Sequence, residues 1–270
     1  MAEVPEVETI VRDLQAAVVG RQLVRSEVVL PAAVRFPTPD EFTALLTDRT
    51  IAGAHRRAKY ILMPLSGDLL LAVHFMLWGT LTLTPATAHR PRETLIVWTL
   101  DRDEELRLLD TLGYARAAVG PPAELAKRLD LDTLGPEALD PDFSVEVLAR
   151  QLAKRRGPLK TVLLNQKVLA GLGNRDADES MWLAHIDPRR TPASLTTDEI
   201  AALHDAICAI LEEGIALRGT QRDLHGVPGK AKHRRNIFER TGRPCPRCGT
   251  PIEHVRINNR NTHFCPTCQR

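Results

Sequence analysis

The sequence predicts an α+β protein in which an N-terminal helix and an antiparallel β-domain precede a helical half and a C-terminal zinc finger. Three observations support this prediction. Residues 3–20 have an apolar face with a helical period. Short apolar runs at hairpin spacing follow, up to about residue 120. Four of the five cysteines form two CxxC pairs near the C-terminus. The 270 residues suffice for two modest domains, each with its own core.

The first element is a helix over Glu3–Gly20. Pro5 suits the first turn of a helix, acidic residues favour its positive end, and Gly20 ends it. Turn signals such as Ser66-Gly67-Asp68 separate the strand-like runs that follow. Their spacing favours an antiparallel sandwich or barrel. The expected strands are Tyr60–Leu65, Leu69–Phe75, Thr80–Thr84, Thr94–Leu100 and Glu105–Leu109.

Proline and glycine mark the change to a helical half, at Pro121-Pro122 and again at Leu134-Gly135-Pro136. Apolar residues then recur with a helical period, and the last helix opens on the capping-box pattern of Thr196 and Glu199. Residues 218–244 show little apolar periodicity, which predicts a mobile basic connector. The expected helices are Ser144–Ala153, Leu159–Ala170 and Thr197–Leu217.

Charge is distributed unevenly along the chain. The net charge is only +2, yet residues 218–270 hold 12 Lys and Arg against 3 Asp and Glu. This asymmetry favours a tail that binds a polyanion, and a solvated basic tail is the alternative. No apolar run reaches the roughly 18 residues of a membrane helix. Since the acidic N-terminus also lacks a secretory signal, we expect a cytoplasmic protein.

The C-terminal cysteines have the spacing of a metal site. Each CxxC pair can present two thiolates from one tight turn, and the 16-residue spacer is long enough for a hairpin that joins the pairs. Two disulfides are the alternative, which a reducing cytosol disfavours. Four ligands leave no open position, so we expect one structural Zn²⁺ bound by Cys245, Cys248, Cys265 and Cys268.

Three further features are ambiguous when each is taken alone. Arg260, between the cysteine pairs, could bond a phosphate bidentately or be a solvated loop charge. The turn Gly171-Leu172-Gly173-Asn174 could bring free N–H groups to a phosphate or be an ordinary turn between helices. Removal of Met1 would expose the α-amine of Ala2, whose neutral fraction can form a Schiff base with a sugar aldehyde carbon. An ordinary acidic helix opening is the alternative there.

Together these features resemble the formamidopyrimidine-DNA glycosylase / endonuclease VIII (Fpg/Nei) family from residue 3 to residue 270. The resemblance implies an N-terminal catalytic helix plus antiparallel β-sandwich over residues 1–135. It further implies a helix-two-turn-helix DNA-binding domain with a basic connector over 136–240 and a four-Cys zinc finger over 241–270, with DNA in the cleft between the domains. The segments that carry the match are Glu3–Glu8, Arg56–Tyr60, Gly171–Asn174 with Ala177–Glu179, and Cys245–Gln269.

The resemblance also implies roles for single residues. The α-amine of Ala2 would attack C1′ of the sugar. Glu3 matches the acidic residue that assists base release and protonates the sugar ring oxygen, and Glu6 matches a second acidic residue near the helix start. The target base must leave the stack before this chemistry can occur. The catalytic group is thus Ala2, Glu3, Glu6 and Lys59, and the phosphate clamp is Lys59, Asn174 and Arg260.

The sequence departs from the family at the nucleophile and at the wedge that fills the gap left by the flipped base. Ala2 stands where the family usually has proline, and its primary amine can still form an imine. The run from His74 to Gly79 lies at the first wedge, where Met76 and Leu77 would fill the gap; core residues beside a strand are the alternative. The second wedge loop ends in Tyr114, which can stack, and lacks the family's arginine that faces the orphaned base.

Two smaller departures concern the helical half. Arg175-Asp176 replaces an apolar-aromatic pair that normally follows the Asn, and Asn165 replaces a usual aspartate. The connector over 219–240, where relatives place a loop that covers the flipped base, is basic here. Its charge could strengthen non-specific attraction to phosphates or favour a bulkier anionic lesion.

We therefore expect a base-excision-repair DNA glycosylase with associated AP lyase activity, acting as a monomer on double-stranded DNA with a damaged or abasic site, at the bacterial nucleoid. The damaged base would be an oxidised one. The alternative is a non-excising paralogue that binds lesion-containing, kinked or abasic DNA. A zinc-ribbon transcription or ribosomal factor would explain residues 245–268 but none of the N-terminal matches.

Overall fold

The computed structural model describes residues 2–270, which form two compact units. The first unit comprises the chain up to Asp132 together with Arg218–Gly229. The second comprises Thr133–Leu217 and Lys230–Arg270. Within residues 2–270, no helix combines the length and the apolar character needed to cross a membrane.

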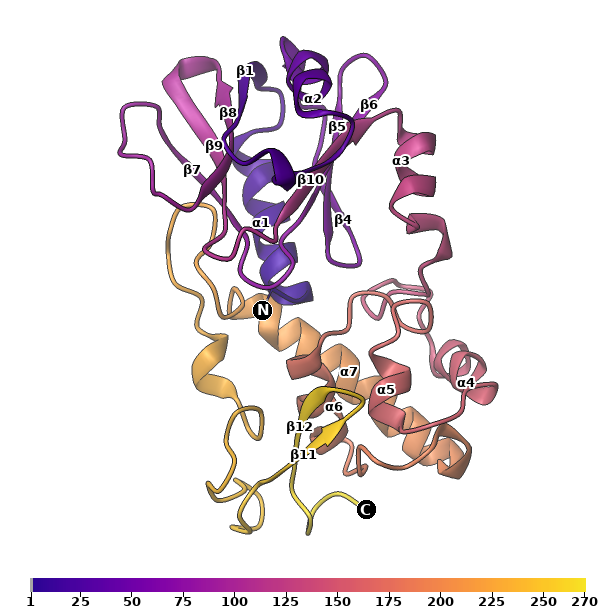
Figure 1. The fold of residues 1–270 in the computed structure, drawn as a ribbon. Helices are drawn as coiled ribbons and strands as arrows, with labels where there is room; N and C mark the ends of the chain where they lie inside the picture. The colour runs from indigo at the N-terminus through magenta and orange to yellow at the C-terminus, as the bar shows by residue number, and fades with distance from the viewer. Residues whose placement is uncertain (1) are drawn as a thin grey trace. The chain divides into compact units, whose positions relative to one another are not determined.

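The first unit is built around two five-stranded sheets with an apolar core between them (Figure 1). One sheet has the order β3-β1-β8-β9-β7 and the other β2-β10-β6-β5-β4. All pairs are antiparallel except β2 with β10. The sheet domain expected from the sequence is therefore confirmed as a sandwich. The strands are β1 (Gln22–Val28), β2 (Val34–Phe36), β3 (Arg49–Thr50), β4 (His55–Arg57), β5 (Tyr60–Leu65), β6 (Leu69–His74), β7 (Thr80–Pro85), β8 (Thr94–Leu100), β9 (Glu104–Leu109) and β10 (Arg116–Gly120).

Helix α1 (Val4–Ala17) buries one side in this core. Val7, Ile10 and Leu14 are at most 2% exposed and recur at helical spacing, so their burial fixes the orientation of the helix. The helix lies against β4 and β5. Its first turn is consequently held by the sandwich, which matters because the predicted catalytic residues lie there. The other helices of this unit are α2 (Pro39–Leu46), α3 (Pro122–Arg128) and the short 3-10 turns Pro31–Ala33 and Asp101–Asp103.

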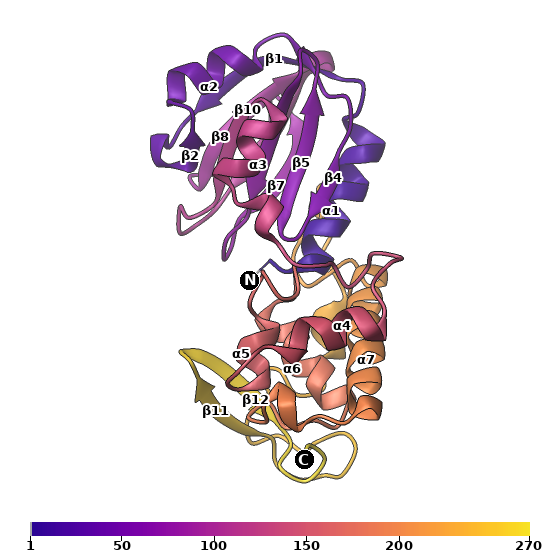
Figure 2. The same ribbon diagram turned by 90° about the vertical axis from the view of Figure 1, so that its right-hand side faces the viewer.

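The second unit packs four helices beside a two-stranded hairpin (Figure 2). Helix α6 contacts α5, α7 and the hairpin strand β12, so it is the central element of the unit. Trp182 and Ile237 are buried with Cys245, Ile252 and Cys265 in a small apolar cluster that joins the hairpin to α6. The elements are α4 (Val145–Ala153), α5 (Leu159–Leu163), α6 (Asn174–Leu183), α7 (Thr197–Ala216), β11 (Glu253–Ile257) and β12 (Arg260–Phe264), with 3-10 turns at Pro192–Ser194 and Ala231–Arg234. A further 3-10 turn, Leu131–Thr133, spans the point of the chain where the first unit passes into the second.

Two expectations about elements were wrong. The helix expected over Leu159–Ala170 ends at Leu163. Just beyond it, Asn165 Oδ1 accepts the Lys167 N–H at 3.0 Å, a local bond that competes with helix formation. The strand-like stretch after residue 20 also contains a helix, α2, which begins with a capping box and a proline in its first turn.

The segment expected to be a mobile connector is anchored at two points. Leu224 is 0% exposed and joins the core of the first unit, while Ile237 is 0% exposed and joins the cluster of the second. Contacts therefore group the two halves of the segment with different units. The division of the chain at residues 135 and 240 stays a prediction.

Candidate functional site

The start of α1 places three predicted catalytic residues in the interior of the first unit. Ala2, Glu3 and Glu6 are 2%, 1% and 4% exposed. The Glu3 N–H donates to Glu6 Oε2 at 2.8 Å, and Glu6 Oε1 accepts the N–H and the hydroxyl of Thr220 at 2.8 and 2.9 Å. Thr220 therefore holds Glu6, and Glu6 holds the backbone of Glu3. The expected removal of Met1 concerns a residue outside the described part of the chain.

Lys59 and His74 lie close together at one end of the sheet that contains β5 and β6. Tyr60 pairs in register with His74, so Lys59 at the β4–β5 turn is next to it. Burial, helped by the positive charges of Lys59 and Arg35, lowers the pKa of His74 to about 4. Nδ1 of His74 accepts the Met76 N–H at 3.0 Å, so the neutral ring carries its proton on Nε2. At neutral pH this side chain can donate one hydrogen bond to a phosphate without carrying charge.

Two neighbouring loops display the predicted wedge residues. His74 pairs with Arg116 and Thr80 pairs with Leu109, so the loops 75–79 and 110–115 leave the two sheets at the same end. A Cβ on Gly79 would lie 2.8 Å from the Ala115 Cβ, which shows how closely the loops approach. Only glycine permits this approach. The exposed fractions at the loops are 43% for Met76, 37% for Leu77, 57% for Trp78, 51% for Leu112 and 49% for Tyr114.

These exposures show that Met76 and Leu77 are not core residues. Asp110 shapes the second loop, because its carboxylate accepts the N–H groups of Leu112, Tyr114 and Ala115 at 2.8–3.0 Å. The result is five large apolar or aromatic side chains exposed on two adjoining loops. Wedges of this kind enter base stacks in proteins that kink DNA.

In the second unit, Asn174 and Arg260 are brought next to each other. Asn174 begins α6 and its Nδ2 donates to the carbonyl of Asn261 at 3.1 Å. Arg260 precedes that residue and is exposed at the tip of the β11–β12 hairpin. The two residues of the hairpin turn, Asn258 and Asn259, have φ angles of 42° and 61°, which asparagine tolerates well.

A buried ion pair fixes this hairpin against the helices. The Lys160 Nζ lies 2.5 Å from Asp178 Oδ1 and donates to the carbonyl of Asn261 at 2.7 Å. The other carboxylate oxygen of Asp178 accepts the His263 N–H at 2.9 Å. The Lys160 and Asp178 side chains are 1% and 0% exposed, so a charged lysine of α5 holds the hairpin strand that carries Arg260.

The four C-terminal cysteines form a metal site. Their Sγ atoms all lie within 4.8 Å of one another, and two pairs are 3.5 and 3.9 Å apart. These separations exceed a disulfide bond and match the edge of about 3.8 Å expected for a tetrahedron with zinc–sulfur bonds of about 2.3 Å. The predicted site for one zinc ion is therefore confirmed. The residues that could hold the ion are Cys245, Cys248, Cys265 and Cys268.

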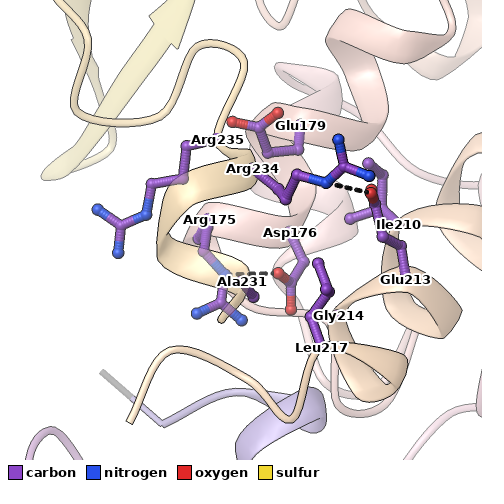
Figure 3. A pocket seen from close by; sticks show the side chains of 10 residues that line it. All are labelled: Arg175, Asp176, Glu179, Ile210, Glu213, Gly214, Leu217, Ala231, Arg234 and Arg235. Carbon is purple, nitrogen blue, oxygen red and sulfur yellow. Dashed lines mark hydrogen bonds and ion pairs between the residues drawn. The ribbon is translucent and has the colours of Figure 1, made fainter. Parts of the chain in front are cut away.

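A pocket of about 370 Å³, which includes the solvent at its mouth, opens in the second unit beside the start of α6 (Figure 3). Arg175 and Asp176, which directly follow Asn174, line it with Glu179 from the next turn. Residues at the end of α7 and in the segment 231–235 complete its wall. The pocket is lined by charged side chains of both signs.

The chain matches known protein families along its length. Three family models match it in succession: the formamidopyrimidine-DNA glycosylase N-terminal domain over residues 1–117, the formamidopyrimidine-DNA glycosylase H2TH domain over 134–224, and the zinc finger found in FPG and IleRS over 242–270. The chain belongs to the formamidopyrimidine-DNA glycosylase family. The resemblance inferred from the sequence motifs is confirmed.

Relatives match over nearly the whole chain. The formamidopyrimidine-DNA glycosylase of Moorella thermoacetica is 45% identical over 95% of both chains, and that of Herpetosiphon aurantiacus is 39% identical over 100% of both. Among solved structures, Lactococcus lactis Fpg in complex with abasic-site DNA matches with a TM-score of 0.93 and 32% identity, covering 100% of both chains. The same enzyme bound to Fapy-dG DNA matches with a TM-score of 0.92 and 31% identity, covering 99% of this chain and 100% of the other.

Several residues that hold the predicted site residues in place cannot be recognised from the sequence alone. Thr220 bonds Glu6, which lies 214 positions away in the sequence, and Lys160 bonds Asn261, which lies 101 positions away. No local sequence pattern marks either residue. Glu8 accepts a hydrogen bond from Arg56 Nε at 3.0 Å, which ties the β4–β5 hairpin to α1. Glu8 lies within the segment Glu3–Glu8 that carries the family resemblance, but the sequence spacing does not reveal Arg56 as its partner. Asp178 likewise lies in a matched segment without any sign that it is buried.

Proposed function

We propose that this chain excises a damaged base from duplex DNA and then cleaves the abasic strand, with the α-amine of Ala2 as nucleophile. Membership of the family carries the glycosylase activity. The burial of Ala2 and Glu3 at the start of α1 supports the choice of nucleophile.

The reaction follows from these groups. The amine lone pair of Ala2 forms a bond to C1′ while the bond from C1′ to the base breaks, and the base leaves with that electron pair and takes up the proton that the amine nitrogen loses. Glu3 donates a proton to the sugar ring oxygen as the bond from C1′ to that oxygen opens, which yields an iminium on C1′. Loss of a C2′ proton then expels the 3′ phosphate, and water releases the enzyme by hydrolysis of the imine. Glu6 keeps Glu3 in place through the backbone bond.

Duplex DNA with a damaged or abasic site is the partner, as in the crystallised complexes of the Lactococcus lactis relative. In the first unit, Lys59 and His74 would bind phosphates, and Met76, Leu77 and Tyr114 would fill the gap left by the flipped base. In the second unit, Asn174 and Arg260 would bind the phosphates near that nucleotide. The chain would act as a monomer at the cytoplasmic nucleoid, where its substrate lies.

Borohydride trapping on a duplex with one abasic site tests the nucleophile. Intact mass first establishes that the chain begins at Ala2. We expect a covalent adduct with the wild type and with Ala2→Pro, and none when the α-amine is acetylated. Glu3→Gln should slow base excision far more than it slows trapping on the abasic duplex. Tight binding without an adduct, together with no excision of any damaged base, would reveal a lesion-binding protein and refute the proposal.

A further inference from the structure

A short excursion of the chain, Arg218–Gly229, packs on helix α1 of the first unit. Its two ends meet, because the Lys230 N–H donates to the carbonyl of Leu217 at 2.8 Å. We call this segment the tongue. Its contacts group it with the first unit, although the chain on both sides of it belongs to the second.

Three successive residues at the start of the tongue are fitted to α1. Arg218 Nη2 donates to both carboxylate oxygens of Asp13, at 2.8 and 2.6 Å. At Gly219 a Cβ would lie 2.9 Å from Glu6 Oε1, so glycine lets the backbone lie directly against that carboxylate. Thr220 then donates its N–H and its hydroxyl to the same oxygen. The bond to Asp13 thus comes two residues before the bonds to Glu6.

The backbone at Arg218 is strained. Its φ angle is 59°, in the left-handed region that glycine adopts freely and other residues disfavour. Such a conformation persists only where the surrounding contacts determine it, and it is commonest near functional sites. Here those contacts are the bonds to Asp13 and to Asp223, whose Oδ2 accepts Arg218 Nη2 at 2.6 Å. One guanidinium therefore joins α1 to the middle of the tongue.

A second anchor follows a few residues later. The Asp223 carboxylate accepts two N–H groups of the tongue at 2.9 and 3.0 Å, which fixes the turn around it. Leu224 is 0% exposed and packs in the core of the first unit. Thr220 lies between this apolar anchor and the ion pair at Arg218, so its position is fixed from both sides.

An ordinary surface ion pair is the alternative for Arg218 and Asp13. The Arg218 side chain is 44% exposed, and exposed ion pairs contribute little to stability. A small gain in stability does not account for a strained backbone two residues before a contact with a predicted catalytic carboxylate. The geometry that the pair imposes on the tongue accounts for both features.

We propose that Arg218 and Asp13 are positioning residues for base excision. Their ion pair fixes the start of the tongue, and this places Thr220 against Glu6. Glu6 then holds the backbone of Glu3, next to the proposed nucleophile. The inference rests on the proposed function and deepens it, because it adds to the catalytic helix a support that lies 205 positions away in the sequence.

Two variants that change the net charge in opposite directions test the inference. Asp13→Asn removes a negative charge at constant size, and Arg218→Gly removes a positive charge while suiting the φ angle of 59°. Single-turnover excision is measured on a Fapy-dG duplex at saturating enzyme, where the rate constant depends neither on affinity nor on the folded fraction. The Kd is measured on a duplex with an uncleavable abasic analogue. Glu124→Gln is the control, since it breaks the exposed Arg128–Glu124 pair of the same unit.

We expect both variants to slow excision by about 10- to 100-fold and to leave the Kd within about two-fold, because misplacing a reacting group by about 1 Å is enough for such a loss. Glu124→Gln should excise at the wild-type rate. If the pair acted by attracting DNA, the two variants would shift the Kd in opposite directions and leave the saturated rate constant unchanged. If the pair only stabilised the fold, that rate constant would also stay at the wild-type value. Either result overturns the inference.

A double-variant cycle tests the path through Thr220. Thr220→Val, which loses the hydroxyl bond to Glu6, should slow excision, and Thr220→Ser, which keeps the hydroxyl, should largely retain the rate. Adding Asp13→Asn to Thr220→Val should cost little more, because both changes disturb the same contact. Losses that multiply in full would show that Asp13 acts elsewhere and would refute the inference.

Failure of the proposed function is distinguishable. A wild type that neither excises Fapy-dG nor cleaves an abasic duplex refutes the proposed function and the inference together. An active wild type whose Asp13→Asn and Arg218→Gly variants excise at the same rate refutes the inference alone.

Discussion

Replacing Lys160 by methionine should strongly destabilise the second unit. Methionine has a similar length but no charge, so Asp178 would remain in a fully buried position without its cation. The His263 N–H bond to the other carboxylate oxygen would persist. Removing one partner of a buried ion pair is expected to lower the free energy of unfolding by about 3–5 kcal/mol. That is a large part of the total of about 5–15 kcal/mol for a typical domain.

Urea unfolding measures this loss. Trp182 is the only tryptophan of the second unit, so its fluorescence reports that unit once Trp78 and Trp98 are replaced by phenylalanine. With a slope of about 2 kcal/mol/M, the midpoint should fall by roughly 1.5–2.5 M. Adding Asp178→Asn should recover much of the stability, because no unpaired charge then remains. A midpoint shift below about 0.5 M at unchanged slope, or a double variant no more stable than Lys160→Met, would refute the reasoning.

Three further predictions concern binding and pH. Arg260→Ala should weaken binding to abasic DNA by about 10-fold or more and leave zinc bound. The control variant Arg256→Ala, on the same hairpin, should have little effect on DNA binding. Equal losses of affinity for the two variants in a fluorescence titration would contradict a specific phosphate contact of Arg260. Removing zinc with a chelator, or by Cys248→Ser, should unfold the hairpin and abolish DNA binding, so apo protein that binds normally would count against a structural zinc. Because the folded pKa of His74 is about 4, well below its unfolded value of about 6.5, its contribution to stability is complete above pH 6.5 and is lost as the pH falls towards 4. The wild type should therefore lose more stability than His74→Gln between pH 6.5 and pH 5, and parallel curves would show that this histidine is not held neutral.

The motifs that carry chemistry could be identified from the sequence because each depends on local spacing. Two CxxC pairs predict a zinc site wherever the hairpin lies, and the apolar period of residues 3–20 predicts a helix with Ala2 and Glu3 at its start. The long strands β5, β6 and β8 were also predicted within one residue of their bounds. Short strands such as β2 and β3, with three and two residues, carry too little pattern and gain their structure from their neighbours in the sheets.

Helix boundaries depended on details that periodicity does not contain. The pattern over Leu159–Ala170 continues past Leu163, but the side chain of Asn165 bonds the backbone and ends the helix. For α2 the signal was present, since Thr38, Pro39 and Glu41 form a capping box with proline in the first turn. The strand-like composition of the surrounding residues masks this local signal.

The sequence by itself determined the family, the zinc ligands, the helix that carries the proposed nucleophile and the asymmetry of charge, because these are set by residue types at fixed local spacing. Only the tertiary structure decided which charges are buried and what they hold. Thr220 bonds Glu6, 214 positions away in the sequence, and Lys160 bonds Asn261, 101 positions away. Arg175 and Asp176 look like an ordinary polar pair at a helix start until their burial at a pocket is known. Burial sets the energy of a charge, and burial is a property of the packed chain rather than of any short segment.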